Sequence, residues 1–270
     1  MVMKPRSLFR HWLRGRQRLL SGLRTLIRQC RRRGDAEQIH ELRVTLRRLR
    51  LFVRVGRPLL DPHVAASFRA WAHEISKLTS PVRDLDVAIE WLRKEQNSSA
   101  ASEACQQARD QLWRTSRHRL RPPPPGLLNA MGKIADTDTA PASLARRARK
   151  LKRRYEAAAR DALPRFSGLR AADQHEFRRT LRWWRYLREL GLRRKRKARD
   201  ALLAALIAAQ ETTGDRQNLA LTMTALRRHW SGPQSAPLRG QLRREQAEQM
   251  VRIKNSLEGL ARRRKWLSPA

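Results

Sequence analysis

Basic side chains recur at three- and four-residue intervals in one short segment, at His40, Arg43, Arg47, Arg50 and Arg54. On a helix, with about 100° and ~1.5 Å per residue, they would form one column roughly 20 Å long within an arc of about 80°. The planar guanidinium group binds phosphate oxygens through two parallel hydrogen bonds and stays charged at physiological pH. The spacing therefore predicts a helix face that binds a phosphate-rich anion.

The same pattern returns 135 positions later in the chain. His175, Arg178, Arg182 and Arg185 match the first four residues of the column one by one. Two copies in one register predict an internal duplication. Each copy also follows another basic helix, and the candidate binding residues of these helices are Arg10, Arg14, Arg24 and Arg28 in the first half and Arg146, Arg149 and Arg153 in the second.

The same residues could instead serve the fold alone. A column of arginines is often only a solvated helix face, and His40 and His175 could cap or hydrogen-bond a neighbouring helix instead of touching a ligand. Like charges at this spacing destabilise a helix by roughly 0.2–0.5 kcal/mol per pair, so four matched basic columns favour a binding role. Neither histidine has a second His, Cys or carboxylate at ligand spacing, and no metal site is predicted.

The composition points to an anionic partner as well. The chain has 61 Lys and Arg, 51 of them Arg, against 24 Asp and Glu, and its formal net charge is +37. Residues 1–60 carry +14 of this charge and residues 140–200 carry +15. Such a charge opposes a compact fold unless a polyanion or local acidic partners offset it. No apolar run of about 18 residues occurs, so no membrane span is expected.

The localisation that the sequence predicts is cytoplasmic. The first residues lack the apolar central region of a secretory signal. Cys30 and Cys105 stand alone, with neither a CxxC partner nor a disulfide framework, which favours reduced thiols.

Ala, Leu, Arg, Glu and Gln dominate and strand-like alternation is absent, so the predicted fold class is all-α. Prolines 122–125 cannot continue a helix, and residues 121–141 are the predicted connection between an N-terminal bundle, 1–138, and a C-terminal bundle, 139–270. Trp184 is expected in the core, at the position that matches Leu49. The expected helices lie near 6–32, 36–55, 63–79, 83–96, 98–120, 142–163, 172–190, 195–211, 216–229 and 236–266.

Two further segments extend the pattern. Residues 78–87 read LTSPVRDLDV and residues 213–220 read TGDRQNLA. Together with the two His/Arg columns, they resemble the CHAD family, the conserved histidine α-helical domain, over essentially the whole chain. The resemblance implies that residues 78–87 turn into a helix. For Asp84 we expect a place in the first turn of that helix, paired with basic neighbours.

The resemblance also implies a fold and a ligand. The fold would be two pseudo-symmetric helical bundles that enclose a basic groove or pore. The groove would bind inorganic polyphosphate, and stand-alone members would associate with polyphosphate granules.

The leading hypothesis is thus non-enzymatic binding of inorganic polyphosphate, a linear polymer that has no bases to read and needs only regularly spaced cations. The alternative is sequence-nonspecific binding of RNA or DNA, although no helix-turn-helix, zinc-finger or RNP signature is present. An enzyme acting on phosphoanhydrides would need metal-binding carboxylates or a Gly-rich phosphate loop, and neither is found. A pure scaffold or granule-coating role is a further alternative. No cofactor is expected, and the sequence leaves the oligomeric state open.

Overall fold

The computed structural model describes residues 3–96, 98–134, 137–192 and 194–262, and no strand occurs in this part of the chain. The fold class is all-α, as predicted. The helices are α1 (Pro5–Arg32), α2 (Ala36–Val55), α3 (Pro62–Leu92), α4 (Ser99–Ser116), α5 (Leu127–Gly132), α6 (Ala140–Ala162), α7 (Ala171–Leu190), α8 (Arg194–Lys197), α9 (Ala201–His229) and α10 (Ala236–Arg262). None of the described helices is both long and apolar enough to cross a membrane.

Short polar side chains set several helix starts. Asp35 accepts a hydrogen bond from the backbone N–H of Gln38 at 2.8 Å and thereby caps α2. Asp200 caps α9 in the same way. Between α1 and α2 the chain turns at Gly34, whose φ is +60° and whose ideal Cβ would lie 2.1 Å from the Trp113 ring. Only glycine fits this turn, because both the left-handed conformation and the contact with Trp113 exclude a side chain.

Two predicted helix breaks are wrong. The helix predicted to end near 79 and restart near 83 is the continuous α3, with Pro81 inside it, and the break predicted between 211 and 216 lies within the continuous α9. Buried residues on both sides of each site, Ile75 and Val82 in α3 for example, bind the helix to its neighbours. Tertiary packing thus outweighs the local preference for a break.

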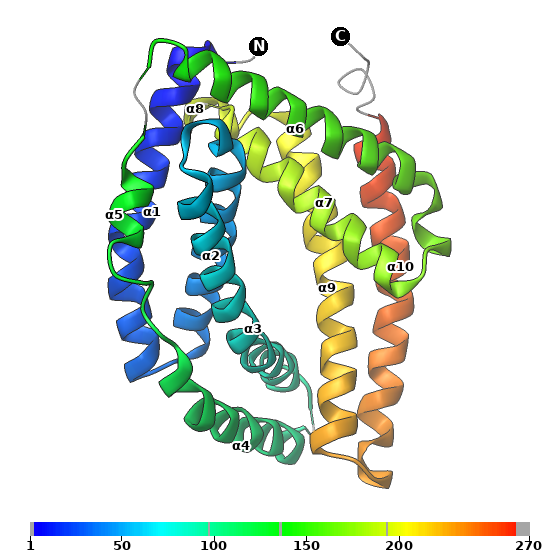
Figure 1. The fold of residues 1–270 in the computed structure, drawn as a ribbon. Coiled ribbons are helices and arrows are strands. Elements are labelled where there is room, and N and C mark those ends of the chain that lie inside the picture. Colours follow the sequence, from blue (N-terminus) through cyan, green and yellow to red (C-terminus); the bar gives the residue numbers. More distant parts are fainter. Residues whose placement is uncertain (1–2, 97, 135–136, 193, 263–270) are drawn as a thin grey trace.

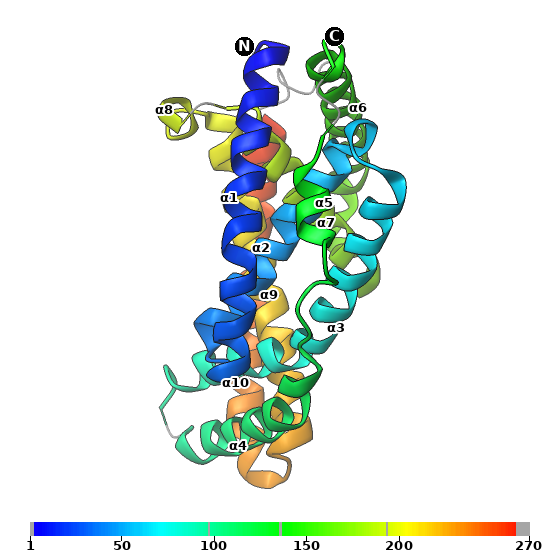
Figure 2. The same cartoon turned by 60° about the vertical axis from the view of Figure 1, so that its left-hand side comes forward.

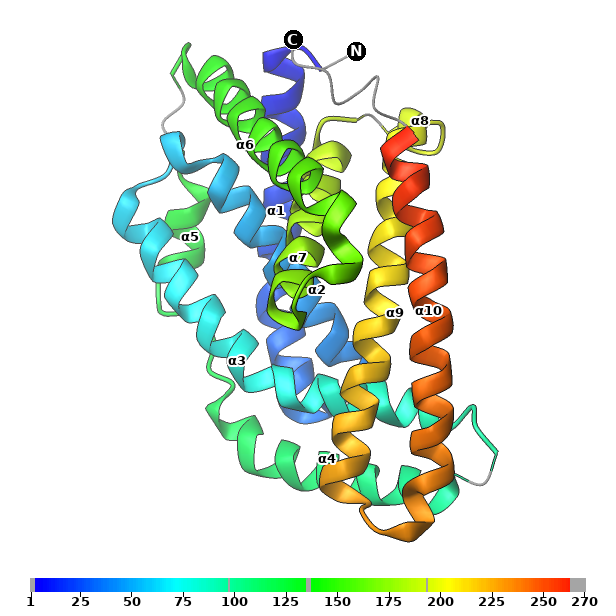
Figure 3. The ribbon, with the colours of Figure 1, turned by 90° about the vertical axis from the view of Figure 1, so that its right-hand side faces the viewer.

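The arrangement of the helices is shown in Figures 1 to 3. In Figure 1, α2 and α3 lie on one side, and α7, α9 and α10 lie on the other. Viewed from the side, α1 runs along much of the length of the molecule (Figure 2). Helices α9 and α10 run side by side in opposite directions (Figure 3), joined by a short turn at Pro233–Ser235. Contacts between α2 and α7 bring together the two helices that carry the predicted columns.

Three buried clusters form the core. One lies within the first half, among α1 to α5, and includes Leu42 and Phe68. A second joins Trp12 of α1 to Trp184 of α7 and Leu257 of α10, and a third joins α3 and α4 to α9 and α10. Trp184 is 1% exposed and Leu49 is fully buried, as expected for matched core positions. Two clusters therefore span the predicted boundary at residue 138, and the division into two bundles stays a prediction.

Candidate functional site

Two arginines of the first column hold α2 against α3. The Nη1 group of Arg43 donates to the carbonyl oxygen of Ser76 at 2.9 Å and to Thr79 Oγ1 at 3.3 Å, and its Nη2 donates to Ser80 Oγ at 3.2 Å. Arg50 donates to the carbonyl oxygen of Ala72 and, at 3.0 Å, to Ser76 Oγ. Much of the donor capacity of these two guanidinium groups is therefore used within the fold.

The other arginines of the two columns are less engaged. Arg47 donates from Nε to the carbonyl oxygen of Arg43 at 3.2 Å. Arg178 and Arg182 of α7 make no hydrogen bond or ion pair with any residue that the structure describes. Arg185 is paired with Glu189 at 2.8 Å. We call the six residues Arg43, Arg47, Arg50, Arg178, Arg182 and Arg185 the arginine cluster.

The two rows of the cluster repel each other across the interface between α2 and α7. Burial, and then the charges of Arg47 and other neighbours, lower the pKa of Arg182 to about 10. Burial followed by Arg47 also lowers the pKa of Arg178, and Arg185 contributes to the lowered pKa of Arg47. All of these groups remain charged at pH 7. The cluster therefore concentrates half-buried positive charge that an anion would stabilise.

The two histidines lie beside the cluster. Burial lowers the pKa of His40, with further lowering by Arg83, Arg47 and Arg43 and an opposing effect of Glu37. Burial lowers the pKa of His175 as well, with Arg178, Arg179 and Arg182 as the neighbouring cations and Glu176 opposing them. Both imidazoles are thus neutral at pH 7. Whether they contact a ligand stays a prediction.

The remaining predicted residues lie apart from the cluster. Arg54 donates to the hydroxyl of Tyr155 and its guanidinium carbon lies 5.0 Å from the centre of the Trp183 ring, so it joins α2 to α6 and α7. The arginines predicted on α1 and α6 are exposed, and none of them contributes to the pKa shifts of the cluster. Their role in binding stays a prediction. These residues are Arg10, Arg14, Arg24, Arg28, Arg146, Arg149 and Arg153.

Sequence reasoning missed two cations that the structure places at the site. Burial lowers the pKa of His40, Arg43 and Arg47, and the charge of Arg83 on α3 lowers it further. Arg216 of α9 lines a cavity together with Arg178. Arg83 and Arg216 belong to the segments at 78–87 and 213–220. Both arginines are present in these two segments, but a segment interpreted as a helix start does not predict which of its side chains lie at the site. The segments lie inside the continuous helices α3 and α9.

The two aspartates of residues 78–87, Asp84 and Asp86, have different surroundings. The expected place of Asp84 in a first helical turn is wrong, since it lies in the middle of α3. Its carboxylate is near Arg43 and Arg83, which oppose the rise in its pKa caused by burial. Asp86 forms a buried ion pair at 2.9 Å with Arg109 of α4, and the same guanidinium donates to the carbonyl oxygen of Gly34.

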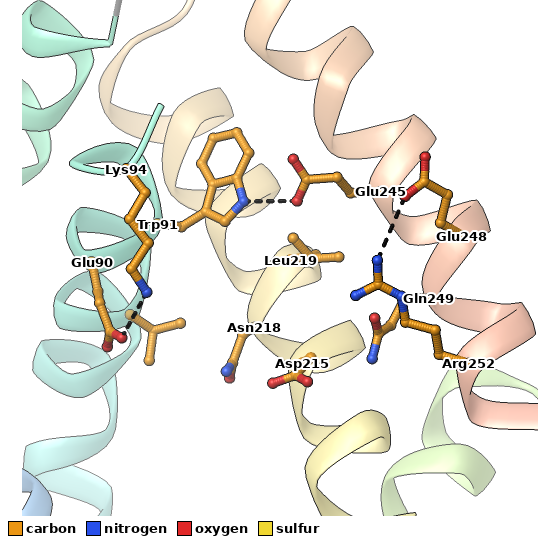
Figure 4. Close-up of a pocket in the computed structure, with 11 residues that line it drawn as sticks. Glu90, Trp91, Lys94, Asp215, Asn218, Leu219, Glu245, Glu248, Gln249 and Arg252 are labelled. Carbon is orange, nitrogen blue, oxygen red and sulfur yellow. Dashed lines mark hydrogen bonds and ion pairs between the residues drawn. The ribbon is translucent and has the colours of Figure 1, made fainter. Parts of the chain in front are cut away.

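A second cavity, of about 330 Å³, lies between α3, α9 and α10 and is lined by carboxylates instead of arginine rows (Figure 4). Carboxylates line it, but most have partners: Glu90 pairs with Lys94 at 3.3 Å, and Glu245 accepts a hydrogen bond from the Trp91 indole at 2.9 Å. Within the described ranges, no three His, Cys, Asp or Glu side chains are placed to hold a metal ion. The acidic surroundings make this cavity a poor site for an anion.

The fold and the site define an all-helical protein in which two basic helices face each other. The CHAD domain model matches residues 17–227, and the chain belongs to the CHAD family. CHAD domains are associated in general with the binding of polyphosphate or triphosphate.

The solved structures that are similar to the chain include two described here. The first is the CHAD domain from the plant Ricinus communis, with a TM-score of 0.67, 20% identity and coverage of 93% of this chain and 91% of that one. The second is PptA from Streptomyces chartreusis, with a TM-score of 0.48, 17% identity and coverage of 95% and 97%. A comparison with curated protein sequences found no match. At this identity the plant domain supports the fold alone.

Proposed function

We propose that this protein binds inorganic polyphosphate, without catalysis, through the arginine cluster between α2 and α7. The observation that carries the proposal is the contact between α2 and α7, which brings two arginine rows together, so that burial and then Arg47 lower the pKa of Arg178 and Arg182. The free fold carries the repulsion between the rows as a cost. An anion that accepts hydrogen bonds from both rows removes the cost and gains charge-assisted bonds.

A linear polyphosphate fits the cluster better than a nucleic acid does. The side chains along α7 from His175 to Arg185 span about 15 Å at ~1.5 Å per residue, so a thin chain with one charge per phosphoryl group can follow the row. A duplex is a wide rod whose phosphates lie on its outside, and it cannot enter between two helices in contact. Counterion release contributes to the affinity for either polymer. In the cell, binding of this kind would place the protein at polyphosphate granules.

A competition titration tests the ligand. Labelled long-chain polyphosphate bound to the protein at physiological salt is displaced by unlabelled polyphosphate, single-stranded RNA or duplex DNA at equal phosphate concentration. We expect polyphosphate to compete best, and its binding to be the least weakened by added salt. Equal or better competition by RNA or DNA would replace the proposal with nucleic-acid binding. Release of orthophosphate during the incubation would contradict a purely binding role.

The affinity for long polyphosphate is expected to rise as the pH falls from 8 to about 6. A bound anion favours the charged form of His40 and His175, so binding takes up protons. The folding stability of the free protein depends on pH in the opposite direction. The folded-state pKa values of both imidazoles lie below 6.5, so the stability that is present above about pH 6.5 is lost as the pH falls.

Titrations at constant ionic strength check this dependence on pH. Long chains are used because only the terminal phosphates change their protonation in this range, and a long chain has few of them. Replacing both histidines by glutamine should flatten the profile. An unchanged slope in the double variant would show that the imidazoles do not face the ligand.

A further inference from the structure

The arginine row of α7 leads into a cavity of about 240 Å³ between α7, α9, α10 and the 3-10 turn Leu163–Gly168. Its basic residues are His175, Arg178 and Arg216, and the amides of Gln174, Gln217 and Gln246 also line it. No carboxylate is among the described residues that line it. The cavity has several times the ~30 Å³ that a water molecule occupies in the liquid, which is room for a phosphoryl group with a few waters.

The donors of this cavity are held in place by the fold. The Oε1 atom of Gln174 accepts a hydrogen bond from Arg216, while its Nε2 donates to the carbonyl oxygens of Phe166 at 3.2 Å and Leu169 at 3.0 Å. Arg178 packs on Gly214, where an added Cβ would lie 3.2 Å from its Nη2. Such preorganised donors lose little conformational entropy when an anion binds.

Arg178 connects the cavity with the arginine cluster. Its Nε is buried and has no hydrogen-bond partner among the described residues, and its pKa is lowered by Arg47 on the opposite helix. A phosphoryl group bound in the cavity would therefore be continuous with a chain that follows α7 past Arg182. The polar side chains that line the cavity come from α7, α9 and α10, whereas the arginines of the cluster form one row on each of two helices.

We infer that this cavity binds the terminal phosphoryl group of a polyphosphate chain, an inference that rests on the proposed function. A terminal phosphoryl group carries up to two negative charges near neutral pH and an interior one carries a single charge. Two arginines that line one cavity, with His175 beside them to take up a proton when the anion binds, suit the terminal group, and single cations in a row suit the interior groups. The protein would thus hold a chain by its end and along its length.

The test compares two ligands on four variants. The ligands are a short linear polyphosphate and the same chain with both terminal phosphoryl groups esterified. The variants are R216Q in the cavity, R182A in the cluster and R179Q, which removes a charge of equal sign from the exposed face of α7, where Arg179 pairs with Glu176 at 3.3 Å. H175Q is a second cavity variant on an exposed side chain, and circular dichroism checks that each variant is folded.

We expect R216Q to weaken binding of the uncapped chain about tenfold, the effect of losing one charge-assisted hydrogen bond, and to change binding of the capped chain less than twofold. R182A should weaken both ligands, and R179Q should affect both slightly and equally. If R216Q and H175Q weaken the binding of both ligands equally, or weaken neither, the proposal of a terminal site is overturned. If R182A changes neither ligand while R216Q still distinguishes them, the cluster proposal fails and the terminal site stands.

Discussion

Replacing Arg182 with alanine is expected to weaken binding of long-chain polyphosphate about tenfold or more, since a hydrogen bond to a charged group contributes ~1.5–3 kcal/mol. Replacing Arg47 should have a similar effect, because it faces Arg182 and Arg178 from α2. Neither change should destabilise the free protein, because each removes a repulsive charge from the cluster. The measurements are a polyphosphate titration at two salt concentrations and a urea unfolding curve for each variant.

The matched control is Arg243 of α10, an exposed arginine with no hydrogen bond or ion pair to another described residue. Its replacement by alanine changes the net charge by the same amount and should cost less than twofold in affinity. Equal losses for R243A and R182A would mean that overall charge alone accounts for the binding. A large loss of stability in R182A would instead show that its guanidinium supports the fold.

Replacing Arg109 with methionine is expected to lower the free energy of unfolding by about 3–5 kcal/mol, since removing one partner leaves a buried charge uncompensated. The side chains of Arg109 and Asp86 are only 8% and 2% exposed, and Oδ2 of Asp86 already lacks a partner among the described residues. Urea unfolding at pH 7 measures the effect. The loss should shrink as the pH falls, because the raised pKa of the unpaired carboxyl lets it take up a proton and become neutral.

Two further variants separate the buried pair from surface effects. Asp110 also approaches Arg109, at 3.4 Å, but its side chain is 51% exposed, so replacing it by asparagine should change stability by less than about 0.5 kcal/mol. The double variant D86N/R109M should recover part of the loss, because it removes both charges. A loss below about 1 kcal/mol in R109M would contradict the importance of this pair for the α3–α4 packing.

The features that could be predicted from the sequence are those that depend on one helix at a time. The three- and four-residue spacing of Arg43, Arg47 and Arg50 placed them on one face, and the same periodicity placed Leu49 and Trp184 in the core. The two helices that carry the rows, α2 and α7, are in contact, while the internal duplication stays a prediction. These outcomes need only the geometry of an α-helix and the preference of apolar side chains for burial.

The features that could not be predicted depend on which helices are neighbours. Pro81 and Gly214 read as helix breaks, and only the packing on both sides keeps α3 and α9 continuous. The hydrogen bonds from Arg43 to α3 require the position of that helix, which no spacing within α2 reveals. The contribution of Arg216 likewise appears only once α7 and α9 are side by side.

The core cluster that joins Trp12 to Leu257 has a consequence for synthesis on the ribosome. At roughly 5–20 residues per second, Leu257 is made about 12 to 50 seconds after Trp12. Throughout that interval the apolar side of α1 lacks its C-terminal partners, while the arginines on its exposed side can already meet ribosomal RNA or free polyphosphate. The packing of α1 against α10 is therefore completed only when nearly the whole chain has been made.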